Sequence, residues 1–136
     1  MTNKRLKKLE FVSQEAIPPE LIGDQDYKTL VVAWGSNYSV IKEAMDKISR
    51  DDSVIQLLGG TRLAFLHFKQ VYPLHSSTAD YLKKAEKTII IENNATSQFA
   101  NLIRMQTGIS IDRKILKYNG MPFFVEEVEQ GLKEYI

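Results

Sequence analysis

The chain has 136 residues, of which 43% are hydrophobic and 26% charged, and this composition is typical of one globular domain. Eighteen basic and seventeen acidic side chains leave a net charge of +1, which argues against a nucleic-acid-binding protein that neutralises phosphates. With no cysteine and two histidines, the sequence excludes disulfides and an iron–sulfur cluster held by this chain, and it offers little for a metal site. Because it shows neither a membrane-length apolar run nor a signal peptide, we expect a cytoplasmic protein with no membrane partner.

The first segment, residues 1–27, shows no sustained hydrophobic period. It contains Pro18-Pro19 and Gly23-Asp24, which are loop and turn signals. We therefore expect an extended lead-in outside the core, followed by one domain at residues 28–136.

From Thr29 onward, short apolar runs alternate with segments of helical period. The apolar runs predict four strands, at Leu30–Trp34, Leu63–Phe68, Thr88–Glu92 and Ile115–Tyr118. The segments of helical period predict four helices: Tyr38–Ser49, one from Ser77 to about Lys84, one that carries Phe99, Leu102 and Ile103, and one from Val125 to Tyr135. Residues 53–58 fit either a strand or a short helix. Strands separated by helices of this length form parallel sheets covered on both faces, so the sequence predicts a three-layer α/β/α fold with a mainly parallel sheet. The most uniformly apolar run, Thr88–Glu92, is expected at its centre.

Several aromatic and histidine side chains have a structural interpretation. We expect Trp34 in the core rather than as a platform for a ligand, and His67 as a hydrogen-bonded structural residue of its strand. The aromatic cluster Tyr118, Phe123 and Phe124 is expected in packing contacts, unless part of it is exposed to a partner. Ser77 followed by Asp80 is typical of a capping box.

The turn Gly35-Ser36-Asn37 follows the first apolar strand, at the end of a parallel strand where ligands gather. Glycine and small polar residues before a helix leave backbone N–H groups for an anion. The sequence has no glycine-rich nucleotide-binding motif, however, so a structural turn with Ser36 or Asn37 as the helix cap is favoured.

A second turn follows the strand Thr88–Glu92, and six of its seven side chains are polar: Glu92, Asn93, Asn94, Ala95, Thr96, Ser97 and Gln98. Helix capping explains Asn94 or Thr96, but not a carboxylate, two amides and a glutamine together. A binding site or interface and plain capping both remain open here.

This turn leads into Leu102-Ile103-Arg104 and resembles the pattern E-x-N-x-T-G-Q-L-A-x-L-I-R of the C-terminal domain of 2-oxoacid:ferredoxin oxidoreductase alpha subunits. Other pieces of that family occur in the same order along nearly the whole chain. They are Val32-Ala33-Trp34-Gly35-Ser36, Phe65-Leu66-His67 with Tyr72-Pro73, the stretch Ile115–Phe123 and the basic segment Lys4–Glu10. The chain departs from the pattern at Ser97, where the family usually has glycine, at Asn37-Tyr38-Ser39, and at an apparent insertion near Asp51–Gly60.

The resemblance implies an enzyme that oxidatively decarboxylates a 2-oxoacid to its acyl-CoA and passes electrons through iron–sulfur clusters to ferredoxin. Thiamine diphosphate and Mg would lie between alpha and beta domains, and this domain alone would bind no cofactor. It also implies the fold of the transketolase C-terminal domain, packed against an upstream alpha-subunit domain and the beta subunit. Residues 1–27 would then be the linker from that upstream domain, and the chain a fragment or a separately encoded piece that is inactive alone. Asn93, Asn94, Thr96 and Gln98 are expected to face a neighbouring domain or the coenzyme A path.

Two other functions remain as alternatives. One is a free-standing small-anion or coenzyme-binding domain of the same fold, with Ser36, Asn37 and the backbone amides of the 94–97 turn as the cradle. The other is a small hydrolase that uses His75 with Ser76 or Ser77.

Overall fold

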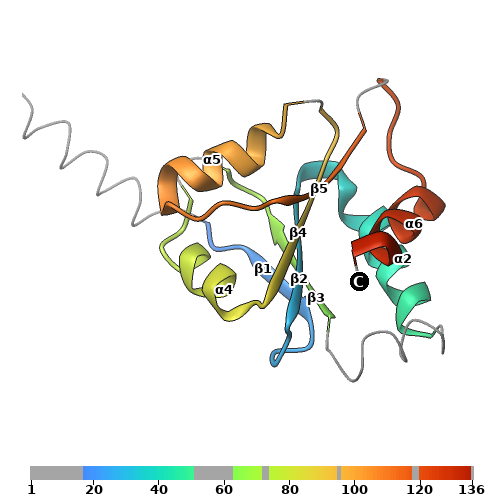
Figure 1. Cartoon of the computed structure of the whole chain (residues 1–136), viewed down its shortest axis with the longest axis horizontal. Helices are drawn as coiled ribbons and strands as arrows, with labels where there is room; N and C mark the ends of the chain where they lie inside the picture. The colour runs from blue at the N-terminus through green and yellow to red at the C-terminus, as the bar shows by residue number, and fades with distance from the viewer. Residues whose placement is uncertain (1–16, 51–62, 72–73, 95, 118–119, 136) are drawn as a thin grey trace, which may run out of the picture.

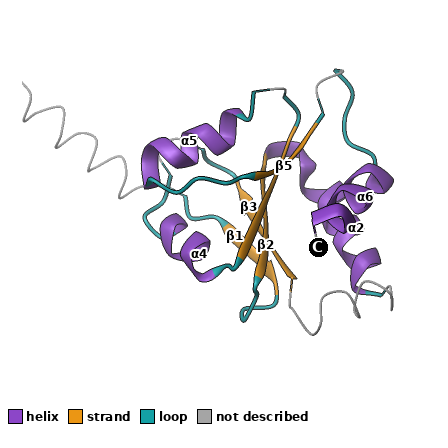
Figure 2. Cartoon of the chain, viewed as in Figure 1, coloured by secondary structure: helices purple, strands orange, loops and turns teal. Residues whose placement is uncertain are grey.

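A computed structural model describes residues 17–50, 63–71, 74–94, 96–117 and 120–135. The predictions for the basic segment Lys4–Glu10, for residues 53–58, for the Asp51–Gly60 insertion, for Tyr72-Pro73 and for Tyr118 therefore lie outside the described residues. Within them, helices cover both faces of one sheet, as the sequence predicts (Figures 1 and 2).

The sheet has five strands in the order β1-β3-β2-β4-β5. Strand β1 pairs antiparallel with β3, and the other neighbours pair in parallel. The strands are β1 (Glu20–Gly23), β2 (Thr29–Trp34), β3 (Leu63–Phe68), β4 (Lys87–Glu92) and β5 (Arg113–Leu116). The predicted strands are confirmed to within a few residues, but the central strand is β2 and not Thr88–Glu92. Strand β2 is third of the five, with β3 and β4 beside it, whereas β4 is an interior strand one place from the middle, between β2 and β5.

Strand β1 lies inside the segment that the sequence analysis assigns to the lead-in. Its four residues pair with the edge of β3, in a register that places Leu21 opposite Leu66. Tyr27, just beyond it, is 2% exposed and belongs to the core. The body of the domain thus includes residues from Glu20 onward. Sequence periodicity missed this strand because four residues are too few to show alternation.

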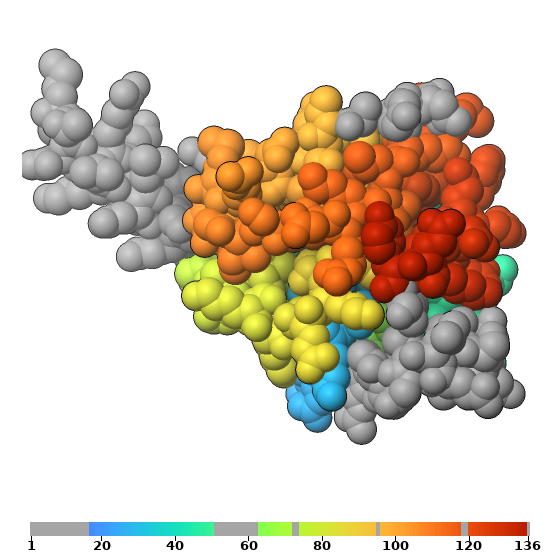
Figure 3. All heavy atoms as spheres, in the orientation of Figure 1, coloured from blue at the N-terminus to red at the C-terminus, as the bar shows by residue number. Residues whose placement is uncertain are grey.

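Helices α4 (Thr78–Lys84) and α5 (Gln98–Thr107) lie on one side of the sheet, and α2 (Tyr38–Ser49) and α6 (Val125–Tyr135) lie on the other (Figure 1). Strand β2 is buried on both faces because its side chains alternate between the two layers. Leu30 and Val32 join the apolar cluster under α4 and α5, whereas Val31 and Ala33 join the cluster under α2 and α6. On the side shown in the space-filling view, the C-terminal half, coloured yellow to red, forms most of the described surface (Figure 3).

Candidate functional site

The two polar turns meet at the carboxyl edge of the sheet, which is at the top of Figure 1. Strand β2 is followed by a short 3-10 helix, η1 (Gly35–Asn37), that leads into α2, and β4 is followed by the turn that leads into α5. Because α2 and α5 leave neighbouring parallel strands toward opposite faces, a crevice opens between them, and this is where open α/β sheets bind ligands. A pocket of about 280 Å³ lies there, lined by Trp34, Gly35, Ser36, Asn37, Asn93, Asn94 and Gln98.

Six of the nine residues singled out in the sequence line this pocket, and Glu92, Thr96 and Ser97 do not. Trp34 lines it as well and is 43% exposed, so the prediction of a core tryptophan is wrong. One edge of its indole meets the ring of Phe99, with ring centroids 6.3 Å apart and planes at 62°. The side chain is thus held from α5 while part of it faces solvent.

Asn93 joins the two turns to a third segment. The Asn37 Nδ2 group donates to Asn93 Oδ1 over 2.7 Å, and Asn93 Nδ2 donates to the Met121 carbonyl over 3.3 Å. Asn37 also occupies the N-cap position of α2, as expected for a cap residue, but its side chain makes no capping hydrogen bond. Its amide therefore closes the rim of the pocket and does not cap the helix.

Glu92, in contrast, is a structural carboxylate that is 1% exposed. Its Oε1 accepts the Phe99 N–H over 2.6 Å and its Oε2 accepts the Ala100 N–H over 3.2 Å, so it holds the first turn of α5. Asn94 Nδ2 donates to the same carboxylate over 3.0 Å. A negative charge at the positive end of a helix is favourable, and here it also satisfies two buried backbone donors.

Asn94 completes the cap of α5. Its Oδ1 accepts the N–H groups of Thr96 and Gln98, over 3.1 Å and 3.2 Å. Between them, Ser97 adopts a left-handed conformation with φ 55° and is 5% exposed. The family's usual glycine at this position adopts such a conformation without strain. Of the two interpretations left open for this turn, capping therefore accounts for Glu92 and Asn94, while the Gln98 side chain makes no hydrogen bond within the described part of the chain.

His67, in strand β3, holds the Gly35–Asn37 turn in place through a hydrogen bond to its backbone. It is 6% exposed, and its Nε2 lies 2.9 Å from the Gly35 carbonyl, which makes Nε2–H the donor. Gly35 itself has φ 73°, a conformation that favours glycine. The structural interpretation of His67 is confirmed.

The residues of the hydrolase alternative form a local turn. His75 Nδ1 lies 2.7 Å from the Ser77 hydroxyl and accepts the Ser77 N–H over 3.1 Å. Among the described residues, no carboxylate orients the imidazole, as a catalytic triad requires. The expected capping box is absent here, because the Ser77 hydroxyl meets His75 instead of the helix.

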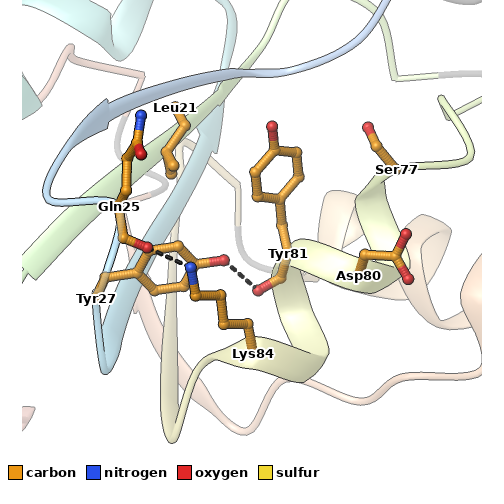
Figure 4. Close-up of a pocket in the computed structure, with 7 residues that line it drawn as sticks. All are labelled: Leu21, Gln25, Tyr27, Ser77, Asp80, Tyr81 and Lys84. Carbon is orange, nitrogen blue, oxygen red and sulfur yellow. Dashed lines mark hydrogen bonds between the residues drawn. The ribbon is translucent and has the colours of Figure 1, made fainter.

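A second hollow, of about 340 Å³, lies away from this edge, between α4 and the β1–β2 turn (Figure 4). The Lys84 ammonium donates to the Gln25 carbonyl and lies 5.2 Å from the centre of the Tyr27 ring, while the Tyr27 hydroxyl donates to the Tyr81 carbonyl over 2.6 Å. Burial, and to a smaller degree the nearby Tyr81 phenol, raises the pKa of Tyr27, so its hydroxyl remains a donor. These contacts fasten α4 to the turn and leave the hollow no uncommitted cation.

Within the described ranges, no group of three or more His, Asp or Glu side chains could hold a metal ion. In that same part of the chain, no helix is long and apolar enough to cross a membrane. No family profile matches the chain.

Curated relatives nevertheless align with the whole chain. It is 30% identical to 2-oxoacid:ferredoxin oxidoreductase 1, subunit alpha, of Sulfurisphaera tokodaii, and 32% identical to 2-oxoacid:ferredoxin oxidoreductase 2, subunit alpha, of Aeropyrum pernix. Each alignment covers 100% of this chain and 21% of the relative, so the chain spans about a fifth of their length. The resemblance stated from the sequence motifs is thereby confirmed.

Solved structures agree with the fold. The 2-oxoglutarate:ferredoxin oxidoreductase of Magnetococcus marinus, solved with 2-oxoglutarate, coenzyme A and succinyl-CoA, superposes with a TM-score of 0.77 at 25% identity, over 98% of this chain and 22% of that one. The alpha chain of a probable 2-oxoacid ferredoxin oxidoreductase from Thermoplasma acidophilum gives a TM-score of 0.55 at 29% identity, over 87% of this chain and 96% of that one. The α/β fold class is confirmed.

Proposed function

Because this chain is homologous over its whole length to part of the alpha subunits of 2-oxoacid:ferredoxin oxidoreductases, we propose that it serves as the C-terminal domain of such a subunit. The whole enzyme would oxidatively decarboxylate a 2-oxoacid to its acyl-CoA, with ferredoxin as the electron acceptor. The role of this domain is to complete the assembly, and it is inactive alone. Its partners are an upstream alpha-subunit domain, joined through the residues that precede Glu20, and the beta subunit.

The observation that carries this proposal is an apolar surface beside the pocket. Trp34, Met121 and Phe124 are 43%, 52% and 54% exposed, and we call them the carboxyl-edge patch. The Asn93 amide joins two of its segments, because it contacts both Asn37 and the Met121 carbonyl. Exposed aromatic and methionine side chains are typical of a protein interface, and the Phe124 ring additionally carries the Lys117 ammonium, 4.5 Å from its centre. From the sequence, exposure of part of the aromatic cluster around Phe123 and Phe124 is expected to indicate a partner surface, and Phe124 is exposed.

The cofactors of the whole enzyme do not fit the residues of this chain. An iron–sulfur cluster needs cysteine thiolates, and the sequence has none. A diphosphate at the start of α5 would need free backbone N–H groups, but Glu92 and Asn94 already accept four of them. Thiamine diphosphate, Mg and the clusters therefore belong to other parts of the assembly, and coenzyme A would at most pass along this edge. For the same reason we do not favour the small-anion alternative.

The test is co-purification of the native complex with a tagged form of this chain. A variant with Trp34→Ser, Met121→Ser and Phe124→Ser should lose most of its larger partners, and with them the coenzyme A-dependent, 2-oxoacid-driven dye reduction. The matched control is Met105→Ser, because Met105 is 81% exposed on α5 and lies outside the patch. Circular dichroism of both purified chains checks that the fold is retained.

Two results would contradict the proposal. One is a wild-type chain that purifies alone from its own cells and without activity. The other is a folded triple variant that retains the partners and the dye reduction at the level of the control.

A further inference from the structure

Lys117 lies directly after β5, and its side chain is only 9% exposed although it carries a charge. The ammonium donates to the Glu127 carboxylate over 2.5 Å and to the Pro122 carbonyl over 2.8 Å. It also lies 4.5 Å from the centre of the Phe124 ring. A charge that is withdrawn from water needs a counter-charge and acceptors, and Lys117 finds both within its own chain. One side chain thus connects the end of β5 to the loop at residues 120–124 and to the first turn of α6.

A second side chain holds the same loop. Asn93, directly after β4, donates to the Met121 carbonyl over 3.3 Å. Two successive carbonyls of the loop are therefore bound from the ends of two neighbouring strands. Phe123, which follows them, is 4% exposed and belongs to the apolar cluster under α2 and α6. The backbone that carries Met121 and Phe124 is thus fixed by contacts within the chain itself.

We propose that Lys117 is a positioning residue for assembly, which presents Met121 and Phe124 of the carboxyl-edge patch to a neighbouring domain. The inference rests on the proposed function and names how that surface is prepared for its partner. Docking is weakened by the ordering of loops and side chains that it requires, and a loop held in place beforehand reduces this loss. Water could satisfy Glu127 and Pro122 if the ammonium were removed, but it would not hold them together. The effect of Lys117 should therefore appear in the order of the loop and not in the fold.

The charges around the patch indicate the kind of partner surface that fits it. Glu127 compensates the charge of Lys117, and the three side chains of the patch carry none. Because the ammonium is committed to groups of its own chain, the patch offers an apolar, uncharged surface. The partner surface that fits is equally apolar. Its contact with the patch should resist high salt, since screening acts on exposed charges.

A competition experiment measures the effect on docking. Wild-type chain and a variant are produced in equal amounts in the same cells, where both compete for the larger partners. The assembled complexes are separated from free chain by size, and mass spectrometry gives the ratio of the two chains in them. The variant Lys117→Met keeps an unbranched side chain and removes the charge. It should be about tenfold depleted from the complexes, the factor expected when one or two side chains must be ordered on binding.

Two further variants and a measurement on the free chain separate positioning from other roles. Lys117→Arg keeps a cation for the carboxylate and the ring, and should restore incorporation to within about twofold of wild type. Lys133→Met removes the other lysine–glutamate pair of α6, with Glu129, and should be incorporated as well as wild type. NMR relaxation of the backbone amides should show the order parameters at Met121 and Phe124 falling from about 0.85 toward about 0.6 in Lys117→Met, while those of α2 stay unchanged.

Equal incorporation of Lys117→Met and wild type would overturn the inference. A depletion without loss of loop order would also overturn it, because Lys117 would then touch the partner directly, and so would a depletion that Lys117→Arg does not reduce. Dissociation of the wild-type complex at about 1 M salt, where the screening length is about 3 Å, would overturn the assigned apolar partner. A wild-type chain without larger partners contradicts the proposed function, and the inference falls with it. In the other outcomes the partners are present, and only the inference fails.

Discussion

Two glutamates hold the starts of two helices, and their surroundings differ sharply. Glu92 is 1% exposed and reaches from the end of β4 to the N–H groups of Phe99 and Ala100 at the start of α5. Glu127 lies in the first turn of α6 itself, where its exposed carboxylate accepts the Phe124 N–H over 3.0 Å and the Lys117 ammonium over 2.5 Å. The buried glutamate joins a strand to a helix through backbone donors, whereas the exposed one ties the start of α6 to the Lys117 side chain, just after β5, at the surface.

The comparison of these two glutamates indicates which polar side chains of the carboxyl edge are available to a ligand. Water can replace the exposed Glu127 contact, but it cannot reach the donors that Glu92 satisfies. Because α5 carries both Phe99 and Gln98, the geometry of the pocket depends on the buried carboxylate. A polar turn thus divides into side chains that build the site, such as Glu92, and side chains that remain free in it, such as Gln98.

The largest effect is expected for Glu92→Ala, which leaves two buried N–H groups without an acceptor. The free energy of unfolding should fall by roughly 3 kcal/mol, as expected for the loss of charged, buried hydrogen bonds. Denaturant unfolding followed by circular dichroism measures it. The control Glu134→Ala removes an exposed carboxylate of α6 and should change the free energy by less than about 0.5 kcal/mol. If Glu92→Ala and Glu134→Ala lowered the free energy of unfolding equally, the proposed difference between the buried and the exposed glutamate would be wrong.

A smaller effect, of opposite sign, is expected at Ser97. Its φ of 55° is strained for a residue with a side chain, and glycine relieves that strain. Ser97→Gly should raise the free energy of unfolding by about 0.5–1 kcal/mol, once the greater freedom of glycine in the unfolded chain is subtracted. The same substitution at Ser39, an exposed residue in the regular helix α2, should lower it. A loss of stability at Ser97 as well would mean that this turn carries no strain.

The smallest expected effect is the pH dependence of the free energy of unfolding that comes from Glu127. The hydrogen bond from Lys117, followed by that from the Phe124 N–H, lowers the pKa of this carboxyl. The pKa of Glu127 is thus lower in the folded chain than in the unfolded chain, where it is about 4.3 for glutamate. The stability that its contacts contribute is therefore fully present above the unfolded-state pKa and is lost as the pH falls through the folded-state pKa.

NMR titration of the side-chain carboxyl carbon of Glu127 measures this pKa directly. Lys117→Met should raise it toward the ordinary value. Lys133→Met removes the partner of Glu129 on the same helix and should leave the pKa of Glu127 unchanged. An unaltered titration in Lys117→Met would contradict the assigned cause.

Much of the fold could be predicted from local patterns. Runs such as Leu30–Ala33 are apolar throughout because both faces of a central parallel strand are covered, and this signal is independent of the rest of the chain. Strand β1 could not be predicted, because it exists only through its pairing with β3. The exposure of Trp34 was missed for a similar reason: an apolar residue at a strand end is covered or uncovered by other segments.

The site could be predicted as a place but not in its details. Parallel strands end at one edge, so the turns after β2 and β4 had to come together. Which of their side chains remain free depends on hydrogen bonds that form only when the backbone is folded. Glu92 turns inward to α5 while Gln98 stays in the pocket, and both have the same polar appearance in the sequence.

The strand order also governs what happens while the chain is being synthesised. Strand β2 is made first among the parallel strands, yet its two neighbours are β3 and β4, the latter ending at Glu92. At a ribosomal rate of about 5–20 residues per second, both edges of an apolar strand wait several seconds for their partners. Chains truncated before Lys87 would leave one edge of this apolar strand unpaired, and their aggregation is the expected cost of this topology.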